Sequence, residues 1–209
     1  NLTQHQLAHT IFPLGAYSTT EIREMAEKQN FCNARKHDSQ DICFVPDGDY
    51  VGFMEQYTGK HYPAGDYLDL EGNKVGTHEG AVRYTIGQRR GLRLPMGDRV
   101  YVCGKDMEKN TVTVGPESAL FASRVIVRDM NWISIPALTG EMRVKAKLRY
   151  RQKEQPAVAS PLADGHILLT FDEAQRAPAV GQAAVLYDGD TVVGGGTICA
   201  VPADTEDCV

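Results

Sequence analysis

The side chain with the clearest chemical potential in this sequence is a cysteine, Cys43. It lies in the stretch KHDSQDICFVPDG, residues 36–48, between an acidic polar lead-in and an apolar pair that ends in a Pro-Asp-Gly turn. A cysteine attacks as its thiolate, and an unperturbed thiol is only slightly ionised at neutral pH. Basic residues at 35–37 would stabilise a thiolate, whereas the neighbouring aspartates would oppose one. The pattern leaves two interpretations open: a nucleophile, or a small buried core residue.

A second candidate is a basic segment, residues 142–153. Its odd positions from 143 to 153 are all Arg or Lys, and its even positions from 142 to 150 are Met, Val, Ala, Leu and Tyr. Because side chains alternate between the faces of a strand, we expect one strand with an apolar face and a positively charged face. Like charges on one face repel, and phosphates would relieve that repulsion. The alternative is an edge strand that its charges protect from aggregation.

A third pattern is the arginine-rich segment RYTIGQRRGLR, residues 83–93, which contains no acidic residue. Its glycines favour a loop, so we expect the arginines to be exposed. A solvated loop and a contact with RNA both fit. The run Gly194-Gly195-Gly196 lacks the Lys-Ser/Thr ending and the following helix of a phosphate loop, so we expect it to allow close backbone approach within a strand.

Capping signals predict helices near the start of the chain. Ser18 and Glu21 fit a capping box that opens one helix. Asp49 fits the N-cap of a second helix, and Gly59 fits its C-terminal end. Large apolar side chains recur on one face of the second helix, and we expect this stripe to pack in a core. The stripe consists of Tyr50, Phe53, Met54 and Tyr57.

Short strand-like segments fill the chain beyond Gly59. AVRYTIG, RVYVCGKD and NTVTVGP are typical of strands, and a polar turn at residues 105–110 would join the last two. More strands follow Pro116, including a hairpin across Asp188-Gly189. Many short strands without intervening helices predict a small β-barrel or sandwich.

We therefore predict a mainly β protein with a helical N-terminal segment. The helical segment covers residues 1–57, a small β-rich central domain covers 58–119, and a C-terminal β-barrel covers 120–203. Residues 204–209 form an acidic tail.

Composition narrows the function classes. The chain has 209 residues, 42% of them hydrophobic, and no apolar run near the ~18 residues of a membrane span. A net charge of −5 argues against nucleic-acid binding over the whole surface. The five cysteines are odd in number and lack Cys-x-x-Cys spacing, so we expect a reducing, cytoplasmic compartment and no metal site. The sequence opens without Met in a polar, helix-like stretch, so we expect a fragment of a longer chain.

Several long segments, in order, resemble the tRNA-specific 2-thiouridylases. The matching segments are FPLG (12–15), EIREMA (21–26), KHDSQDICF (36–44), GTHEGAVRYTIGQRRGL (76–92), YVCGKDMEKNTVTVG (101–115), LRYRQ (148–152) and VGQAAVLYDGDTVVGGGTI (180–198). They run along almost the whole chain, so the resemblance is specific.

The resemblance implies an ATP-dependent sulfurtransferase acting on C2 of the wobble uridine of tRNA. Residues 1–57 would then end the adenylating domain, and residues 120–203 would be the tRNA-binding barrel. ATP, with Mg, would bind a Ser-Gly-Gly-x-Asp loop that this sequence lacks, so no cofactor-binding residue is expected here. Partners would be tRNA and a sulfur-relay donor protein, and we expect a monomer.

The resemblance also assigns site residues. Cys43 aligns with the cysteine that carries the persulfide. Its sulfur would reach C2 either directly or as hydrosulfide, after a second cysteine outside this sequence forms a disulfide with Cys43. Arg149 and Tyr150 align with tRNA contacts in the barrel, and Gln182 aligns with a further one. This chain has Val180 where many relatives have proline.

Two functions from different classes follow. One is a sulfurtransferase fragment that is inactive alone. The alternative is a non-catalytic tRNA- or RNA-binding module in which Cys43 is structural. The remaining cysteines, Cys32, Cys103, Cys199 and Cys208, match no family role.

Overall fold

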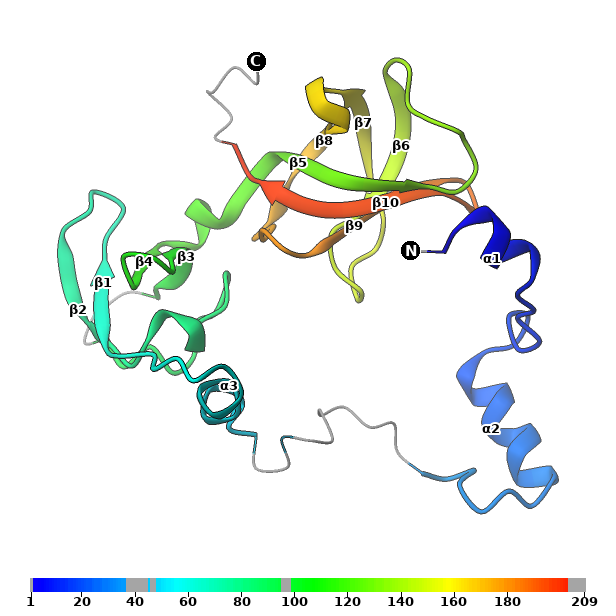
Figure 1. The fold of residues 1–209 in the computed structure, drawn as a ribbon, viewed down its shortest axis with the longest axis horizontal. Helices are drawn as coiled ribbons and strands as arrows, with labels where there is room; N and C mark the ends of the chain where they lie inside the picture. Colours follow the sequence, from blue (N-terminus) through cyan, green and yellow to red (C-terminus); the bar gives the residue numbers. More distant parts are fainter. Residues whose placement is uncertain (1, 37–44, 46–47, 95–98, 203–209) are drawn as a thin grey trace. The chain divides into compact units, whose positions relative to one another are not determined.

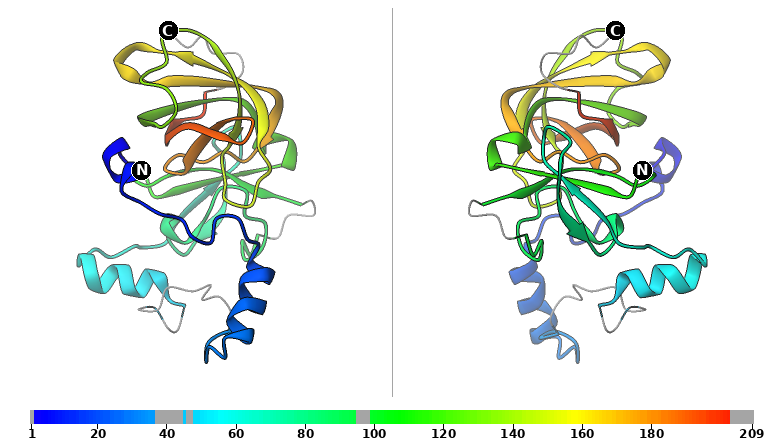
Figure 2. Two further views of the ribbon diagram at one scale, coloured as in Figure 1. Left: turned by 90° about the vertical axis from the view of Figure 1, so that its right-hand side faces the viewer. Right: turned by 90° about the vertical axis from the view of Figure 1, so that its left-hand side faces the viewer.

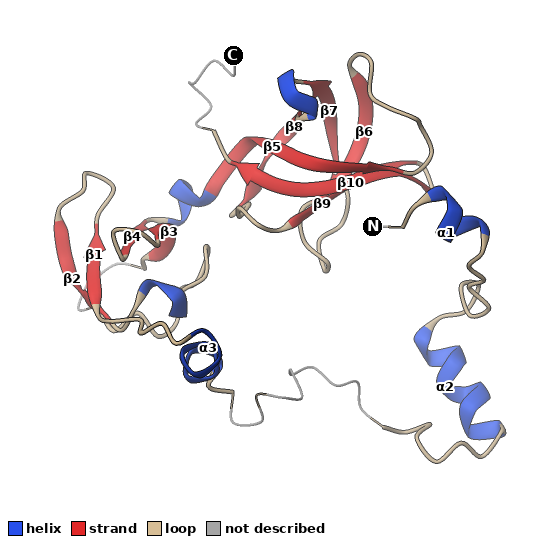
Figure 3. Cartoon of the chain, viewed as in Figure 1, coloured by secondary structure: helices blue, strands red, loops and turns tan. Residues whose placement is uncertain are grey.

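A computed structural model describes residues 2–36, 45, 48–94 and 99–202. Cys43 therefore lies outside the described residues. The chain divides into two compact units, one formed by Gln4–His61 and the other by Asn1–Thr3 with Tyr62–Val209. The first unit contains the α-helices, and the second contains the strands (Figure 3). The mainly β fold with a helical N-terminal part is confirmed.

The helical unit comprises α1 (Gln4–Ala8), α2 (Thr19–Lys28) and α3 (Tyr50–Thr58). The capping box that opens α2 is confirmed, because the Glu21 amide donates to Ser18 Oγ at 3.3 Å and the Ser18 amide donates to Glu21 Oε2 at 2.7 Å. The Glu21 carboxylate accepts from the Ser18 amide and also from the Ser18 hydroxyl at 2.8 Å, and these two hydrogen bonds lower the pKa of Glu21. The capping box thus starts α2 where the sequence predicts.

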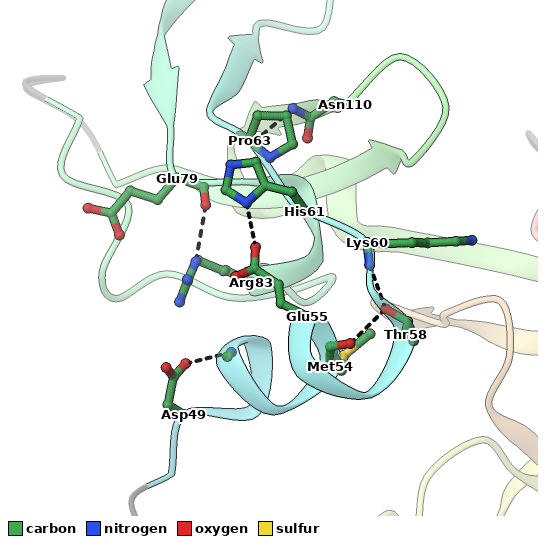
Figure 4. Close-up of polar contacts among 11 residues, drawn as sticks. Asp49, Met54, Glu55, Thr58, Lys60, His61, Pro63, Glu79, Arg83 and Asn110 are labelled. Atoms are coloured by element: carbon green, nitrogen blue, oxygen red, sulfur yellow. Dashed lines mark hydrogen bonds and ion pairs between the residues drawn. The ribbon is translucent and has the colours of Figure 1, made fainter.

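Helix α3 also begins and ends where its sequence indicates. Asp49 accepts a hydrogen bond from the Gly52 amide at 3.0 Å (Figure 4), and Gly59 ends the helix in the left-handed conformation with φ 67°. The prediction that its apolar stripe packs in a core is wrong for Tyr50 and Tyr57, whereas Phe53 and Met54 are partly buried. Tyr57 is 82% exposed and Tyr50 is also exposed, while Phe53 and Tyr57 stack on one another at 6.0 Å. Helical spacing gathers these rings on one side, but it supplies no neighbouring element to bury them.

The second unit begins with a four-stranded sheet in the order β2-β1-β4-β3. Its strands are β1 (Gly65–Leu68), β2 (Lys74–His78), β3 (Tyr101–Asp106) and β4 (Thr111–Gly115). β1 and β4 run parallel, and the other neighbours run antiparallel. Fully buried Tyr67, Val102 and Val112 form the centre of its core.

The predicted strand AVRYTIG is wrong. Residues Ala81–Arg83 form the short 3-10 helix η1, and Gly87, with φ 85°, turns the chain that follows. The predicted pair of strands around residues 105–110 is confirmed as β3 and β4. Ala81 in η1 and Tyr84 just after it are buried in the core of the sheet, which a strand-like composition alone does not reveal.

The rest of the unit is a closed six-stranded barrel in the order β10-β5-β8-β7-β6-β9 (Figures 1 and 2). All its pairs are antiparallel. A 3-10 helix, η2 (Glu117–Leu120), leads into it, and a second, η3 (Ala163–Gly165), joins β7 to β8. The strands are β5 (Phe121–Trp132), β6 (Met142–Lys147), β7 (Gln155–Pro161), β8 (Ile167–Arg176), β9 (Ala183–Asp188) and β10 (Thr191–Ala200).

Two predictions for the end of the barrel are confirmed. The β9–β10 hairpin turns at Gly189, with φ 56°. The glycines of β10 allow close approach, because a Cβ on Gly196 would lie 2.4 Å from the Arg128 carbonyl oxygen and 2.8 Å from Met130 Sδ. Any side chain there would push β10 away from β5, so barrel closure requires glycine at this point.

We expect Gly196→Ala to destabilise the barrel. The added methyl would meet the β5 backbone, and overpacking of this kind typically costs ~1–3 kcal/mol. Gly140→Ala is the control, since a Cβ there meets nothing within 4 Å and should change stability by no more than ~0.5 kcal/mol. Thermal and denaturant unfolding of both variants checks this, and equal stabilities would show that the strands are not so tightly spaced.

Candidate nucleic-acid interface

The basic segment is a strand only in its first half. β6 ends at Lys147, and Val144, Ala146 and Leu148 are buried, as the alternation predicts. Residues 148–154 instead form the connection to β7, so the prediction of one continuous strand to residue 153 is wrong. The strand gives way to a turn where Gln152 folds back. Its side-chain Oε1 accepts from the Leu148 amide at 3.1 Å, and its backbone amide donates to the Arg149 carbonyl at 3.1 Å.

The edge-strand alternative for this segment is also wrong. β6 pairs with β7 on one side and with β9 on the other, so it has no open edge to protect. Its charges are partly compensated: Arg143 forms an ion pair with Asp172, and this guanidinium holds the pKa of Asp172 below its usual value. Lys147 lies over the Tyr187 ring, 6.0 Å from its centroid. Among the described residues, Lys145 on β6 and Arg151 and Lys153 in the β6–β7 connection have no ion pair.

Arg149 and Tyr150 stand side by side in that connection but in different surroundings. The half-buried Arg149 donates from Nη2 to the carbonyl oxygen of Ala177, which fixes its guanidinium at the end of the barrel. Tyr150 is 95% exposed. A ring so exposed contributes little to packing and is available to stack on a base.

A cavity of about 460 Å³ opens beside this connection. Three arginines line it, and Glu173 is the only acidic residue among its lining residues in the described chain. The lining residues are Phe121, Arg149, Arg151, Gln152, Gln155, Glu173, Ala174, Gln175 and Arg176. Positive charge in a concave site attracts anions, so this end of the barrel favours phosphate.

Gln182 lies at the same end of the barrel, in the connection between β8 and β9. This connection also contains Ala177, the residue that accepts from Arg149. The Gln182 carbonyl accepts from the Ile198 amide at 2.8 Å, and its side-chain Oε1 is buried without a hydrogen-bond partner among the described residues. The fold thus brings Arg149 and Gln182 to one end, although 33 positions separate them in the sequence.

Sequence reasoning missed the role of Gln152. Besides its two bonds within the turn, its Nε2 donates to Oε1 of the buried Gln175 at 2.7 Å. Gln175 in turn donates to the Glu173 carbonyl at 2.6 Å. This chain of bonds fixes the turn that presents Arg149 and Tyr150. No local signal reveals it, because the partner on β8 is 23 positions away.

The cysteines in the described chain are free thiols: Cys32 is exposed, and Cys103 and Cys199 are partly buried. Cys103 donates to the Tyr101 carbonyl at 3.4 Å, and burial raises the pKa of its thiol. These features favour an unreactive Cys103. Among the described residues, we find no helix with the length and apolar character needed to cross a membrane.

Family models define the class of protein. The aminomethyltransferase β-barrel domain model matches residues 122–198, which include most of the barrel. The tRNA methyl transferase PRC-barrel domain model matches residues 51–116, and the tRNA methyl transferase HUP domain model matches residues 1–47. The chain thus follows the order of a HUP, a PRC-barrel and a β-barrel domain.

Individual relatives narrow this class. The chain is 48% identical to tRNA-specific 2-thiouridylase MnmA 1 of Thermoanaerobacter sp. (strain X514), over 95% of this chain and 54% of the relative. It is 46% identical to MnmA of Heliobacterium modesticaldum and 43% identical to MnmA of Clostridioides difficile, each over 95% of this chain. The chain belongs to the tRNA-specific 2-thiouridylase family, and it spans about half the length of the curated relatives it matches.

We expect Tyr150→Ala to leave the stability of the barrel unchanged within ~0.5 kcal/mol, because the ring is exposed. Phe171→Ala is the control for a buried ring, and it should cost ~3–5 kcal/mol. Thermal unfolding measures both. A marked loss of stability in Tyr150→Ala would mean that the ring packs, and its availability for stacking would then be refuted.

Proposed function

We propose that the full-length protein containing this chain inserts sulfur at C2 of the wobble uridine of tRNA. The observation that carries this proposal is the 48% identity, over 95% of the chain, to a relative named as a tRNA-specific 2-thiouridylase. The domains would divide at residues 57 and 119, with the acidic tail after 203. The free thiols of the described cysteines favour a reducing, cytoplasmic compartment.

Cys43 is the sulfur carrier in this proposal. ATP, with Mg, supplies the adenylyl group that turns the C2 oxygen into a leaving group. A donor protein leaves a terminal sulfur on Cys43 as a persulfide. That sulfur attacks C2 directly, and a second cysteine then breaks the S–S bond of the adduct by forming a disulfide with Cys43. Alternatively, the second cysteine forms this disulfide first, and the released hydrosulfide attacks C2. In both cases the new C–S bond replaces the C–O bond to the leaving adenylate.

The end of the barrel described above is the proposed tRNA contact. Arg149 supplies positive charge from a fixed position, and its remaining N–H groups suit a phosphate. Tyr150 supplies an exposed ring for stacking on a base. Gln182 is partly exposed at the same end of the barrel, and its side chain is the third proposed contact.

The 209 residues alone would be inactive in thiolation, because they contain no glycine-rich loop of the kind that binds the phosphates of ATP. The competing proposal is a non-catalytic RNA-binding module with a structural Cys43. The basic connection favours RNA binding in both proposals, so only the behaviour of Cys43 separates them.

Replacing Cys43 tests the choice. In the full-length protein, Cys43→Ser should abolish 2-thiouridine formation, because serine cannot hold a transferable sulfur, while tRNA affinity stays within about two-fold. Cys32→Ser is the matched control, since it removes an exposed thiol and should retain activity. Mass spectrometry of the tRNA and filter binding provide the two measurements. Normal thiolation by Cys43→Ser would refute the carrier role.

Replacing the two neighbours in the β6–β7 connection tests the tRNA contact. We expect Arg149→Ala to weaken tRNA binding and to lower the slope of log affinity against log salt by about one unit. Tyr150→Ala should weaken binding with little change in slope, because stacking involves no counterion release.

The control is Arg128→Ala, which removes an arginine that is ion-paired with Asp129 at 3.3 Å. It should leave both affinity and slope as they are. If Arg149→Ala also leaves both unchanged, the barrel does not hold tRNA through this end.

A further inference from the structure

A second basic depression lies between the loop after η1 and the chain that leads into β3 of the four-stranded sheet. Its volume is about 300 Å³, and its lining combines three arginines with small or aliphatic residues. The arginines come from two segments: Arg89 and Arg93 lie in the loop after η1, and Arg99 lies two residues before β3. The lining residues are Arg89, Gly91, Leu92, Arg93, Leu94, Arg99 and Val100, and none of these is acidic.

The charges in this depression are only partly compensated. Arg93 forms an ion pair with Glu79, with Nη1 2.6 Å from Oε1. Within residues 2–36, 45, 48–94 and 99–202, neither Arg89 nor Arg99 forms an ion pair or a hydrogen bond. Guanidinium groups that share one concave site repel each other, so an anion between them is favourable.

Other exposed cations of the same sheet differ in this respect. Lys74 pairs with Asp66 at 2.6 Å, and Lys109 pairs with Asp106 at 3.6 Å. Arg83 donates from Nε to the Glu79 carbonyl oxygen at 3.1 Å (Figure 4). Among the described cations of this surface, Arg89, Arg90 and Arg99 lack such a partner, and of these Arg89 and Arg99 line the depression.

The loop that carries Arg89 is firmly held. The Gly87 amide donates to the Val102 carbonyl at 2.8 Å, and the Val102 amide donates to the Gln88 carbonyl at 2.9 Å. The Gln88 side chain spans the loop, because its Oε1 accepts from the Thr85 amide at 3.0 Å and its Nε2 donates to the Arg90 carbonyl at 2.9 Å. Little conformational entropy would therefore be lost when a ligand binds.

The backbone at the depression is also unusual. Arg93 is a non-glycine residue in the left-handed region, with φ 51°, two positions after Gly91 with φ 80°. Such conformations are unfavourable for residues with a Cβ and concentrate at ligand sites. The conformation places the Arg93 side chain against both Glu79 and the depression.

We infer that this depression binds a phosphate of an RNA backbone, as a contact additional to the one at the barrel end. Planar guanidinium groups match phosphate oxygens in pairs. Among the described residues, the lining contains no aromatic ring on which a base would stack, which favours a backbone phosphate over a base. The inference rests on the proposed function, in which tRNA is the RNA.

Two alanine variants of the full-length protein test this contact. Arg89→Ala and Arg99→Ala should each weaken tRNA binding about 3- to 10-fold near 0.1 M salt and reduce the salt slope by ~0.7 to 0.9. Arg89→Lys should keep the slope, because the charge remains, and should weaken binding about two-fold, because the paired hydrogen bonds are lost. The controls are Lys109→Ala on the same sheet and Arg128→Ala on the barrel, and both should bind like the parent.

The outcomes separate this inference from the proposed function. If the parent thiolates tRNA while both alanine variants keep its affinity and slope, the depression is not an RNA contact and the proposed function stands. If the parent protein does not bind tRNA, both the inference and the proposed function fail. If the variants bind tRNA normally but lose sulfur transfer from the donor protein, the depression docks an acidic protein surface and the inference is overturned.

The melting temperature of each variant shows whether the substitution has disturbed folding. If an alanine variant unfolds, Arg89→Lys combined with Arg99→Lys decides instead. The inference would be overturned if this double lysine variant binds tRNA as tightly as the parent and if inorganic phosphate weakens tRNA binding equally in both proteins. Weaker binding at an unchanged salt slope would support it.

Discussion

The geometry of the strand-rich unit depends on the backbone of one residue, Ala177. This residue is 1% exposed and has a left-handed φ of 53°. Its amide donates to the Leu120 carbonyl at 2.6 Å, its carbonyl accepts from Arg149, and its Cβ would meet a side chain placed on Gly87 at 3.0 Å. Ordinary dihedral angles would not aim the amide and the carbonyl at these two partners. The conformational cost of ~1–2 kcal/mol is tolerated because packing and hydrogen bonds together impose it.

Arg176, the residue before it, joins the same parts by charge. Its Nε lies 3.0 Å from Glu117 Oε1, and its guanidinium lies over the Tyr101 ring at 5.4 Å. One end of β8 thus holds the sheet, the 3-10 helix η2 and the basic connection of the barrel in a fixed relation. Pairs between exposed groups contribute little individually, whereas several on one buried backbone restrict movement together.

Sequence reasoning succeeded where the cause is local and failed where it is distant. The capping box at Ser18, the left-handed Gly59 and the glycines of β10 depend on neighbouring atoms or on a missing Cβ, so residue type alone predicts them. The period of two along the basic segment identified β6, but it continued past Lys147 into a turn that Gln175 helps to fix from another strand. Arginine clusters were visible in the sequence, but which charges are compensated was not, since Asp172 lies 29 positions from Arg143.

The strand order of the barrel carries a consequence for its synthesis. β5 is the first barrel strand to leave the ribosome, yet one of its two neighbours is β10, the last. Until residue 200 has been translated and released, β5 and β9 are open edges, and such edges invite pairing with other nascent chains. Messages that stall or end before that point would yield an unclosed sheet. A chaperone that covers the edges of β5 and β9 on the ribosome would therefore prevent this pairing until β10 closes the barrel.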